Sequence, residues 1–271
     1  MKNLMIYVNP EKDWDKGNFN QGWSDENKVL VKVQIDNCLS LGWKAEDIIL
    51  VTNFDYEYNG IKATVISDDT YCECSPTATK INVILYMIEQ GLIGDDLYFF
   101  HDLDAYQLEN ISESDIGLNR DNIAITDYGI SNINQGRNLR WSTGSIFFRK
   151  ESKDIFETIK EQVYFYKTNE EIALLELLKK RRFYGIRERI KKLNITYNFA
   201  IRRRNVIAQY EMAEKPIKVI HFHPFDTRPV FYLSRREYHD NKMVCIHGKN
   251  PMGVPLVNER LKEIFNTHGI N

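Results

Sequence analysis

The segment from Asp95 to Ala105 reads DDLYFFHDLDA and indicates how the chain folds. Its apolar part, residues 97–100, is typical of a buried strand, and two carboxylates, Asp102 and Asp104, follow it. Side chains two residues apart in an extended segment point to the same side, so we expect these carboxylates to converge. In open α/β sheets, ligands bind at the carboxyl ends of the strands, and paired carboxylates suit Mg²⁺ or Mn²⁺. The alternative is an acidic turn that closes a strand.

The overall composition is that of an ordinary globular protein. The chain has 271 residues, 27% of them charged, and its formal net charge of -2 predicts no general attraction to polyanions. Because no apolar run is long enough, we expect no transmembrane helix, and the N-terminus lacks the pattern of a signal peptide. Four cysteines, Cys38, Cys72, Cys74 and Cys245, lack zinc-site spacing. We therefore expect reduced thiols in a cytoplasmic protein, with peripheral membrane association as the alternative.

Hydrophobic patterns along the chain alternate between strand-like and helix-like segments, which predicts an α/β fold with a mostly parallel sheet. Thr77 or Thr79 is expected to cap one of the helices. The polar stretches 11–24 and 132–140 are expected to be loops. Strands are expected at residues 4–8, 47–52, 63–66, 97–100, 123–127, 144–148 and 218–223, and helices at 29–39, 81–88, 153–165, 169–180 and 257–265.

This order of elements resembles the glycosyltransferases of the GT-A fold, particularly the glycogenin-like and bacterial galactosyltransferase-like branch. The resemblance covers roughly residues 3 to 230. It is carried by a first strand ending in Tyr7-Val8-Asn9, by Lys80, by Asp102-Leu103-Asp104, by a strand ending in Asp127, by Trp141-Ser142-Thr143-Gly144 and by Val219-Ile220-His221-Phe222. The sequence departs from the family at Ser142, where Asn is frequent, and at Phe222-His223-Pro224, where Gly-Lys-Pro is usual.

The resemblance implies a GT-A, Rossmann-like domain with a mostly parallel central sheet, flanked by helices and followed by a helical, basic C-terminal portion. We expect a catalytic domain over residues 1–230, with an acceptor-side basic helical segment at about 165–210. Residues 231–271 would be an extension packed on the same domain. The implied activity is metal-dependent transfer of a hexosyl or pentosyl group from a nucleoside-diphosphate sugar, such as a UDP-sugar, to an acceptor hydroxyl.

The resemblance also implies roles for individual residues. Asp102 and Asp104 would bind Mn²⁺ or Mg²⁺ together with His221, while His223 is a rival ligand because both histidines share a strand face. Asp127 would accept hydrogen bonds from the donor sugar, and Glu170 and Glu171 are candidates for the catalytic carboxylate at the reacting face. The donor would contact Tyr7, Val8, Asn9, Lys80, Asp102, Ser142, Thr143 and Gly144.

Residues from Lys179 to Arg204 carry eleven Lys or Arg side chains against the single acid Glu188, with Phe and Tyr side chains between them. A basic patch inside a near-neutral protein is an electrostatic footprint for an anionic partner. We therefore predict an anionic acceptor, either nucleic acid or a membrane-associated, lipid-linked glycan. The alternative is a solvated helical face.

Two other functions are compatible with the pattern. A sugar nucleotidyltransferase of related fold would need a glycine-rich basic loop after the first strand, where the sequence has Asn9-Pro10-Glu11-Lys12-Asp13. A non-catalytic nucleic-acid-binding module could be built around residues 179–204, although the chain has no recognised DNA-binding motif. Metal-dependent hydrolysis of a nucleotide sugar would separate the transferase from the binding module.

Overall fold

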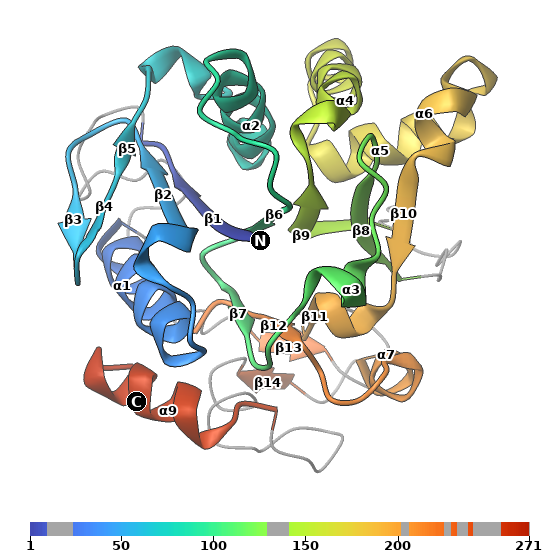
Figure 1. The fold of residues 1–271 in the computed structure, drawn as a ribbon. Coiled ribbons are helices and arrows are strands. Elements are labelled where there is room, and N and C mark those ends of the chain that lie inside the picture. The colour runs from blue at the N-terminus through green and yellow to red at the C-terminus, as the bar shows by residue number, and fades with distance from the viewer. Residues whose placement is uncertain are drawn as a thin grey trace.

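A computed structural model shows an α/β protein built on one large sheet (Figure 1). The structure describes residues 1–9, 24–128, 141–201, 206–224, 229–231, 238–240 and 256–270. The order of strands in the large sheet is β10-β8-β9-β6-β1-β2-β5. In chain order these strands are β1 (Lys2–Tyr7), β2 (Ile48–Thr52), β5 (Thr64–Val65), β6 (Tyr98–His101), β8 (Ile123–Asp127), β9 (Trp141–Phe148) and β10 (Ile190–Leu193).

The large sheet is mostly parallel, which confirms the expected fold class. Strands β5, β2, β1 and β6 run parallel to one another, and β10 is parallel to β8. Only β9, among the strands of this sheet, runs antiparallel to its neighbours β6 and β8. The start of β9 therefore lies at the same edge as the ends of β1, β6 and β8.

Helices cover both faces of this sheet, so its strands are buried on both sides, as is usual for parallel sheets. Leu4 of β1 packs with α2 and α4, whereas the next residue, Met5, packs with α1. Phe100 and Phe99 divide in the same way between two clusters. The described helices are α1 (Ser24–Ser40), α2 (Thr79–Glu89), α3 (Glu113–Ile116), α4 (Lys153–Tyr166), α5 (Glu170–Lys179), α6 (Tyr184–Glu188), α7 (Val206–Met212) and α9 (Glu259–Thr267).

A three-stranded sheet of order β11-β12-β7 brings distant parts of the chain to the end of β6. It consists of β7 (Ala105–Gln107), β11 (Phe199–Ala200) and β12 (Val219–His221). Because β7 follows β6 after three residues and pairs antiparallel with β12, His221 lies opposite Ala105. Two hairpin-like pairs complete the strands, β3 (Glu57–Tyr58) with β4 (Ile61–Lys62) and β13 (Pro229–Phe231) with β14 (Tyr238–Asp240).

Several expected details differ in the structure. Helix α2 has Ala78 at its N-cap and no side-chain cap, because the hydroxyls of Thr77 and Thr79 bond to Glu170 and to the Cys72 backbone instead. The basic segment is expected to be helical, but it contains the edge strand β10. The first and last residues of this strand, Ile190 and Leu193, are apolar and buried. The expected loops 11–24 and 132–140 lie outside the described residues, apart from Ser24, which begins α1.

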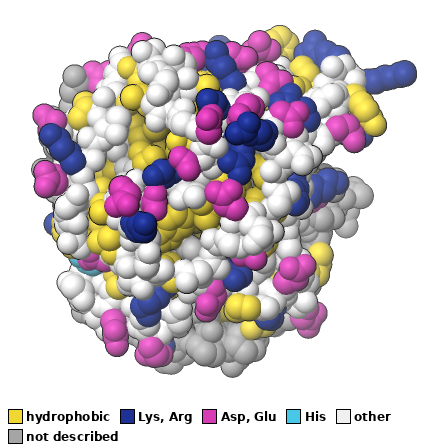
Figure 2. Space-filling view, in the orientation of Figure 1, with side chains coloured by type: hydrophobic (Ala, Val, Ile, Leu, Met, Phe, Trp, Pro, Cys, Tyr) yellow, Lys and Arg dark blue, Asp and Glu magenta, His cyan; other side chains and the backbone are white. Residues whose placement is uncertain are grey.

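Charged side chains of both signs are spread over the face of the molecule that Figure 2 shows. No helix within the described ranges combines the length and the apolar character needed to cross a membrane. The predicted boundary near residue 230 falls where the structure describes only 229–231 and 238–240, so the division into a domain and an extension stays a prediction.

Arg260 of the C-terminal helix α9 binds this helix to α1 and to the end of β7. Its guanidinium donates to Asn37 Oδ1 at 2.6 Å and to Ser40 Oγ at 2.6 Å, both in α1. It also donates to the backbone oxygens of Gln107 at 3.1 Å and Leu108 at 3.3 Å, at the end of β7. One side chain thus ties residues near the C-terminus to two elements of the first half of the chain.

We predict that Arg260→Ala lowers the free energy of unfolding by about 1–3 kcal/mol, because it leaves several acceptors without their donor. Lys262→Ala is the matched control on the same helix, since Lys262 makes a surface ion pair with Glu259 and such pairs contribute little. Urea unfolding of both variants measures the difference. Equal stability of the two variants would show that Arg260 does not fasten α9.

Candidate active site

The two carboxylates of the Asp-Leu-Asp segment sit in a turn between β6 and β7. Strand β6 ends at His101, and Ala105, which begins β7, donates its backbone N–H to the Asp102 oxygen at 3.0 Å. The backbone N–H of Asp102 is held by the Gly144 oxygen at 3.0 Å. The predicted convergence is therefore present, but its cause is a tight turn and not the shared face of an extended strand.

His221 joins the two carboxylates from β12. Its Nε2 lies 3.1 Å from Asp104 Oδ1, and ligand atoms of Asp102, Asp104 and His221 all lie within 4.8 Å of one another. Burial would raise the pKa of Asp104, but His221, together with His223 and a backbone hydrogen bond, outweighs burial and holds that pKa below its usual value. Burial would also lower the pKa of His221, but Asp104 raises it. The pair therefore favours a carboxylate beside an imidazolium.

The ring of His221 is held from behind by Asn198 and Gly144. Asn198 places its Oδ1 3.1 Å from His221 Nδ1 and donates through Nδ2 to Ser142 Oγ at 2.8 Å. With Nδ1 donating to Asn198, the lone pair of the neutral ring is on Nε2, on the side of Asp104. A Cβ on Gly144 would lie 2.5 Å from the His221 ring, so only glycine leaves room for it.

Lys80, in the first turn of α2, bridges two carboxylates from different parts of the chain. Its Nζ lies 2.8 Å from Asp102 Oδ1 and 3.1 Å from Glu170 Oε1. Burial would lower the pKa of Lys80, but Asp102 and Glu170 raise it above its usual value, so the ammonium stays charged. Lys80 is therefore a buried, paired lysine and not a solvated helix lysine.

Two consecutive glutamates begin α5, whose N-cap Asn169 accepts a hydrogen bond from the Ile172 backbone at 2.9 Å. Glu170 is buried and accepts hydrogen bonds from Thr143 Oγ1 at 2.7 Å and Thr77 Oγ1 at 3.2 Å, in addition to its ion pair with Lys80. Glu171 accepts the backbone N–H of Thr143 at 3.1 Å. Acidic side chains are also favoured in the first turn of a helix.

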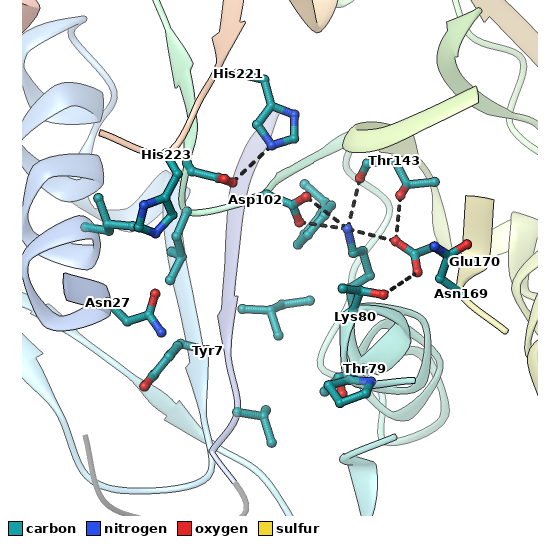
Figure 3. A pocket seen from close by; sticks show the side chains of 18 of the residues that line it. Tyr7, Asn27, Thr79, Lys80, Asp102, Thr143, Asn169, Glu170, His221 and His223 are labelled. Carbon is teal, nitrogen blue, oxygen red and sulfur yellow. Dashed lines mark hydrogen bonds and ion pairs between the residues drawn. The ribbon is translucent and has the colours of Figure 1, made fainter. Parts of the chain in front are cut away.

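A cavity of about 450 Å³ lies between these groups (Figure 3). Figure 3 shows Lys80, Asp102, Thr143 and Glu170 joined on one side, with His221 and His223 on the other and Tyr7 and Asn27 at the end of β1 and on α1. The residue types combine apolar walls with convergent charges, as in sites for polar small molecules. The cavity is lined by Ile6, Tyr7, Val8, Asn27, Leu30, Tyr71, Pro76, Thr77, Thr79, Lys80, Phe100, Asp102, Leu103, Asp104, Thr143, Asn169, Glu170, Glu171, His221 and His223.

The cavity brings together most of the residues singled out from the sequence, but four lie outside its lining. Asn9 is buried and its backbone is held by Asn53. Ser142 and Gly144 stand behind His221, and Asp127, at the end of β8, lies 3.9 Å from Lys192. His223 lines the cavity but is not part of the three-residue group that could hold a metal.

Comparisons with solved structures identify the architecture. The galactosyltransferase LgtC, in complex with donor and acceptor sugar analogues, aligns with a TM-score of 0.54 over 83% of this chain and 89% of its own, at 13% identity. Glycosyltransferase GlyE of Streptococcus pneumoniae aligns with a TM-score of 0.51 over 87% of this chain and 58% of its own, at 9% identity. This chain has the GT-A fold. Neither a protein-family model nor a curated protein sequence matches it.

At this level of identity the comparisons establish the GT-A fold alone, and the activity has to be argued from the site. In this chain the turn after β6, the first turns of α2 and α5, and β12 meet at one edge of the sheet. Sequence reasoning missed Asn198 and the contact of Thr77 with Glu170. No local pattern marks either residue, because their partners lie more than 20 residues away along the chain.

We predict that Gly144→Ala displaces the His221 ring and lowers the free energy of unfolding by about 1–3 kcal/mol, since a new methyl group overpacks a filled site. Gly185→Ala is the control, because a Cβ there meets nothing within 4 Å and alanine favours its helix by up to about 1 kcal/mol. Thermal unfolding and the NMR signals of His221 report the two effects. An unshifted His221 signal in Gly144→Ala would contradict the close packing.

Proposed function

We propose that this protein is a metal-dependent glycosyltransferase that uses a nucleoside-diphosphate sugar as donor. The observation that carries the proposal is the meeting of Asp102, Asp104 and His221 at the wall of the cavity, across more than a hundred residues of chain. The GT-A fold supports it, because the edge of the sheet where these groups meet is where open α/β sheets bind ligands.

The donor set fits a divalent cation. Two carboxylates and one imidazole provide oxygen and nitrogen ligands, and imidazole is better suited to Mn²⁺ than to Mg²⁺. In our proposal Asp102, Asp104 and His221 hold the ion, and His223 remains the rival ligand because it also lines the cavity. When bound, the ion would neutralise the charge that develops on the leaving nucleoside diphosphate.

The end of β1 is the proposed place of the nucleotide base. Tyr7 and Val8 line the cavity there, and Asn9 is anchored by Asn53, which accepts from its backbone N–H at 2.8 Å and donates to its oxygen at 2.5 Å. This double hydrogen bond holds the chain rigidly just after the strand. A UDP-sugar is the donor we propose, with the sugar lying between Lys80 and the start of α5.

The two glutamates of α5 have different surroundings, which suggests different roles. Glu170 is engaged by Lys80, Thr143 and Thr77, so its task in the proposed mechanism is to hold Lys80 and Thr143 in place. Glu171 lines the cavity and is the proposed carboxylate at the reacting face, where it would take a proton from the acceptor hydroxyl. The sugar-contacting role of Asp127 stays a prediction.

The anionic acceptor also stays a prediction. The cavity is lined by residues outside the segment Lys179–Arg204. Within that segment Arg189 is bound to Asp154 and Asp121, and Lys191 donates to backbone oxygens at the end of α3. These two cations have structural partners, whereas Arg202, Arg203 and Arg204 lie outside the described residues.

We predict that Asp104→Asn abolishes the thermal stabilisation that Mn²⁺ and UDP together give the protein, because a ligand that binds only the folded state raises its apparent stability. Asp96→Asn is the control, since Asp96 is an exposed carboxylate that precedes β6 at the opposite edge of the sheet. Mn²⁺ binding is measured independently by electron paramagnetic resonance.

His221→Ala is expected to weaken Mn²⁺ binding in the same assay. If His223→Ala removes binding and His221→Ala does not, the ligand is His223. If Asp104→Asn binds Mn²⁺ and UDP as the unchanged protein does, the proposed metal site is wrong.

We further predict that Glu171→Gln lowers metal-dependent release of UDP from the donor by about 10²–10⁴-fold while the donor still binds, because the base is lost and the cavity is kept. Glu170→Gln should instead lower the free energy of unfolding by about 1–3 kcal/mol, since it weakens a buried network. Coupled detection of UDP and thermal unfolding separate the two variants. Unchanged turnover in Glu171→Gln would remove this residue from the mechanism.

A further inference from the structure

Exposed aromatic side chains occur at the end of α4 and at the start of α6. Phe165 exposes 73% of its surface and Tyr184 exposes 57%, and Tyr164 and Tyr166 are also exposed. Large apolar side chains are normally exposed singly, so a group of them on a soluble fold indicates contact with something else. The remaining exposed large apolar residues among the described parts of the chain, such as Val65 and Leu92, are scattered elsewhere.

Cations accompany these rings. Lys180 Nζ lies 4.6 Å from the centre of the Tyr166 ring and 5.9 Å from that of Phe165, which links the end of α5 to the end of α4. Arg182 lies 4.6 Å from the Phe183 ring, and Arg187 lies 5.4 Å from the Tyr184 ring. We call the surface formed by Phe165, Tyr166, Lys180, Arg182, Tyr184 and Arg187 the aromatic–basic face.

The net charge of this part of the molecule is positive although the whole chain is slightly acidic. From Lys179 to Glu188 there are five Lys or Arg side chains and one acid. One of the five, Lys179, is paired with Glu176 of its own helix. Lys180, Arg182 and Arg187 each lie over an aromatic ring, and Figure 2 shows Lys or Arg, hydrophobic and acidic side chains at the upper right corner, where Figure 1 places α6.

One end of the aromatic–basic face, at Tyr166, lies near the cavity, whereas the other end, at α6, leads into the start of β10 at the opposite edge of the sheet. Tyr166 ends α4, and Asn169, three residues further on, already lines the cavity with Glu170 and Glu171. Helix α6 projects from the edge of the molecule beside β10, so the face is convex (Figure 1). A convex surface suits a flat partner better than a nucleic-acid strand, which has to lie in a groove.

We propose that the aromatic–basic face docks on an anionic lipid bilayer. Aromatic rings are favoured at the boundary between headgroups and acyl chains, and Lys and Arg near the surface are attracted by anionic headgroups. Long cationic side chains lying over rings can keep their charge among the headgroups while the rings enter the interface.

This docking does not require the donor, the metal ion or any catalysis, so it can be tested apart from the proposed transferase activity. The full chain is floated with vesicles of phosphatidylcholine alone and with vesicles of phosphatidylcholine and phosphatidylglycerol. We expect binding to the anionic vesicles only, and weaker binding at high salt, because screening shortens the reach of the surface charges.

Two variants probe the two components of the face. Phe165→Ala should weaken vesicle binding roughly tenfold, because the ring is lost from the interface. Arg182→Glu with Arg187→Glu should weaken it more than tenfold, since each charge near the surface contributes about a fivefold factor. All three positions are exposed, so the variants should unfold at the same temperature as the unchanged protein.

Matched controls lie on the other half of the sheet. Val65→Ala removes apolar surface from the opposite edge strand, β5, and Lys44→Glu reverses an exposed cation before β2. Neither should alter vesicle binding. Failure to bind anionic vesicles at low salt, or equal binding by all variants, would overturn the proposal. Binding of a fluorescent single-stranded oligonucleotide that is lost in the same two variants, without vesicle binding, would assign the face to nucleic acid instead.

Discussion

The antiparallel pairing of β7 with β12 is the constraint on which the site depends. It places His221 opposite Ala105, and the backbone N–H of Phe222 continues the pairing by donating to the Asp104 oxygen at 2.9 Å. Because Asp104 immediately precedes β7, this pairing leaves its carboxylate 3.1 Å from His221 Nε2. A slip of one residue would turn His221 to the other face of the strand and remove it from the carboxylates.

The site concentrates charge that would be costly to bury without partners. Lys80 lies between the half-buried Asp102 and the buried Glu170, and the half-buried Asp104 lies against His221, so each of these carboxylates has a basic side chain within hydrogen-bond distance. Removing one member of such a group leaves the others uncompensated and destabilises the fold. The same arrangement holds the side chains in fixed positions, which a site that must orient a charged ligand requires.

Gly144 and Asn198 set the position of the His221 ring, although neither of them carries a charge. Gly144 provides room for the His221 ring, and Asn198 orients it through a hydrogen bond and is itself held by Ser142. Ser142, expected from the family resemblance to contact the sugar, thus has a partner on the side of β9 away from the cavity lining. The position of the His221 ring therefore depends on three residues outside the group of Asp102, Asp104 and His221.

The sequence alone determined the α/β class and the order of the strands and helices, because periodicity is a local property. Its resemblance to a family singled out Asp102, Asp104, Lys80 and His221, which all line one cavity in the structure. The sequence also located the basic segment with its aromatic side chains. The tertiary structure decided that the two aspartates converge through a turn, that Glu170 is held by Lys80, Thr143 and Thr77 while Glu171 accepts the backbone N–H of Thr143, and that Asn198 supports His221. It also decided that β10 interrupts the basic helices. These features depend on contacts between residues far apart in the chain, and such contacts exist only after the strands have paired and the helices have packed.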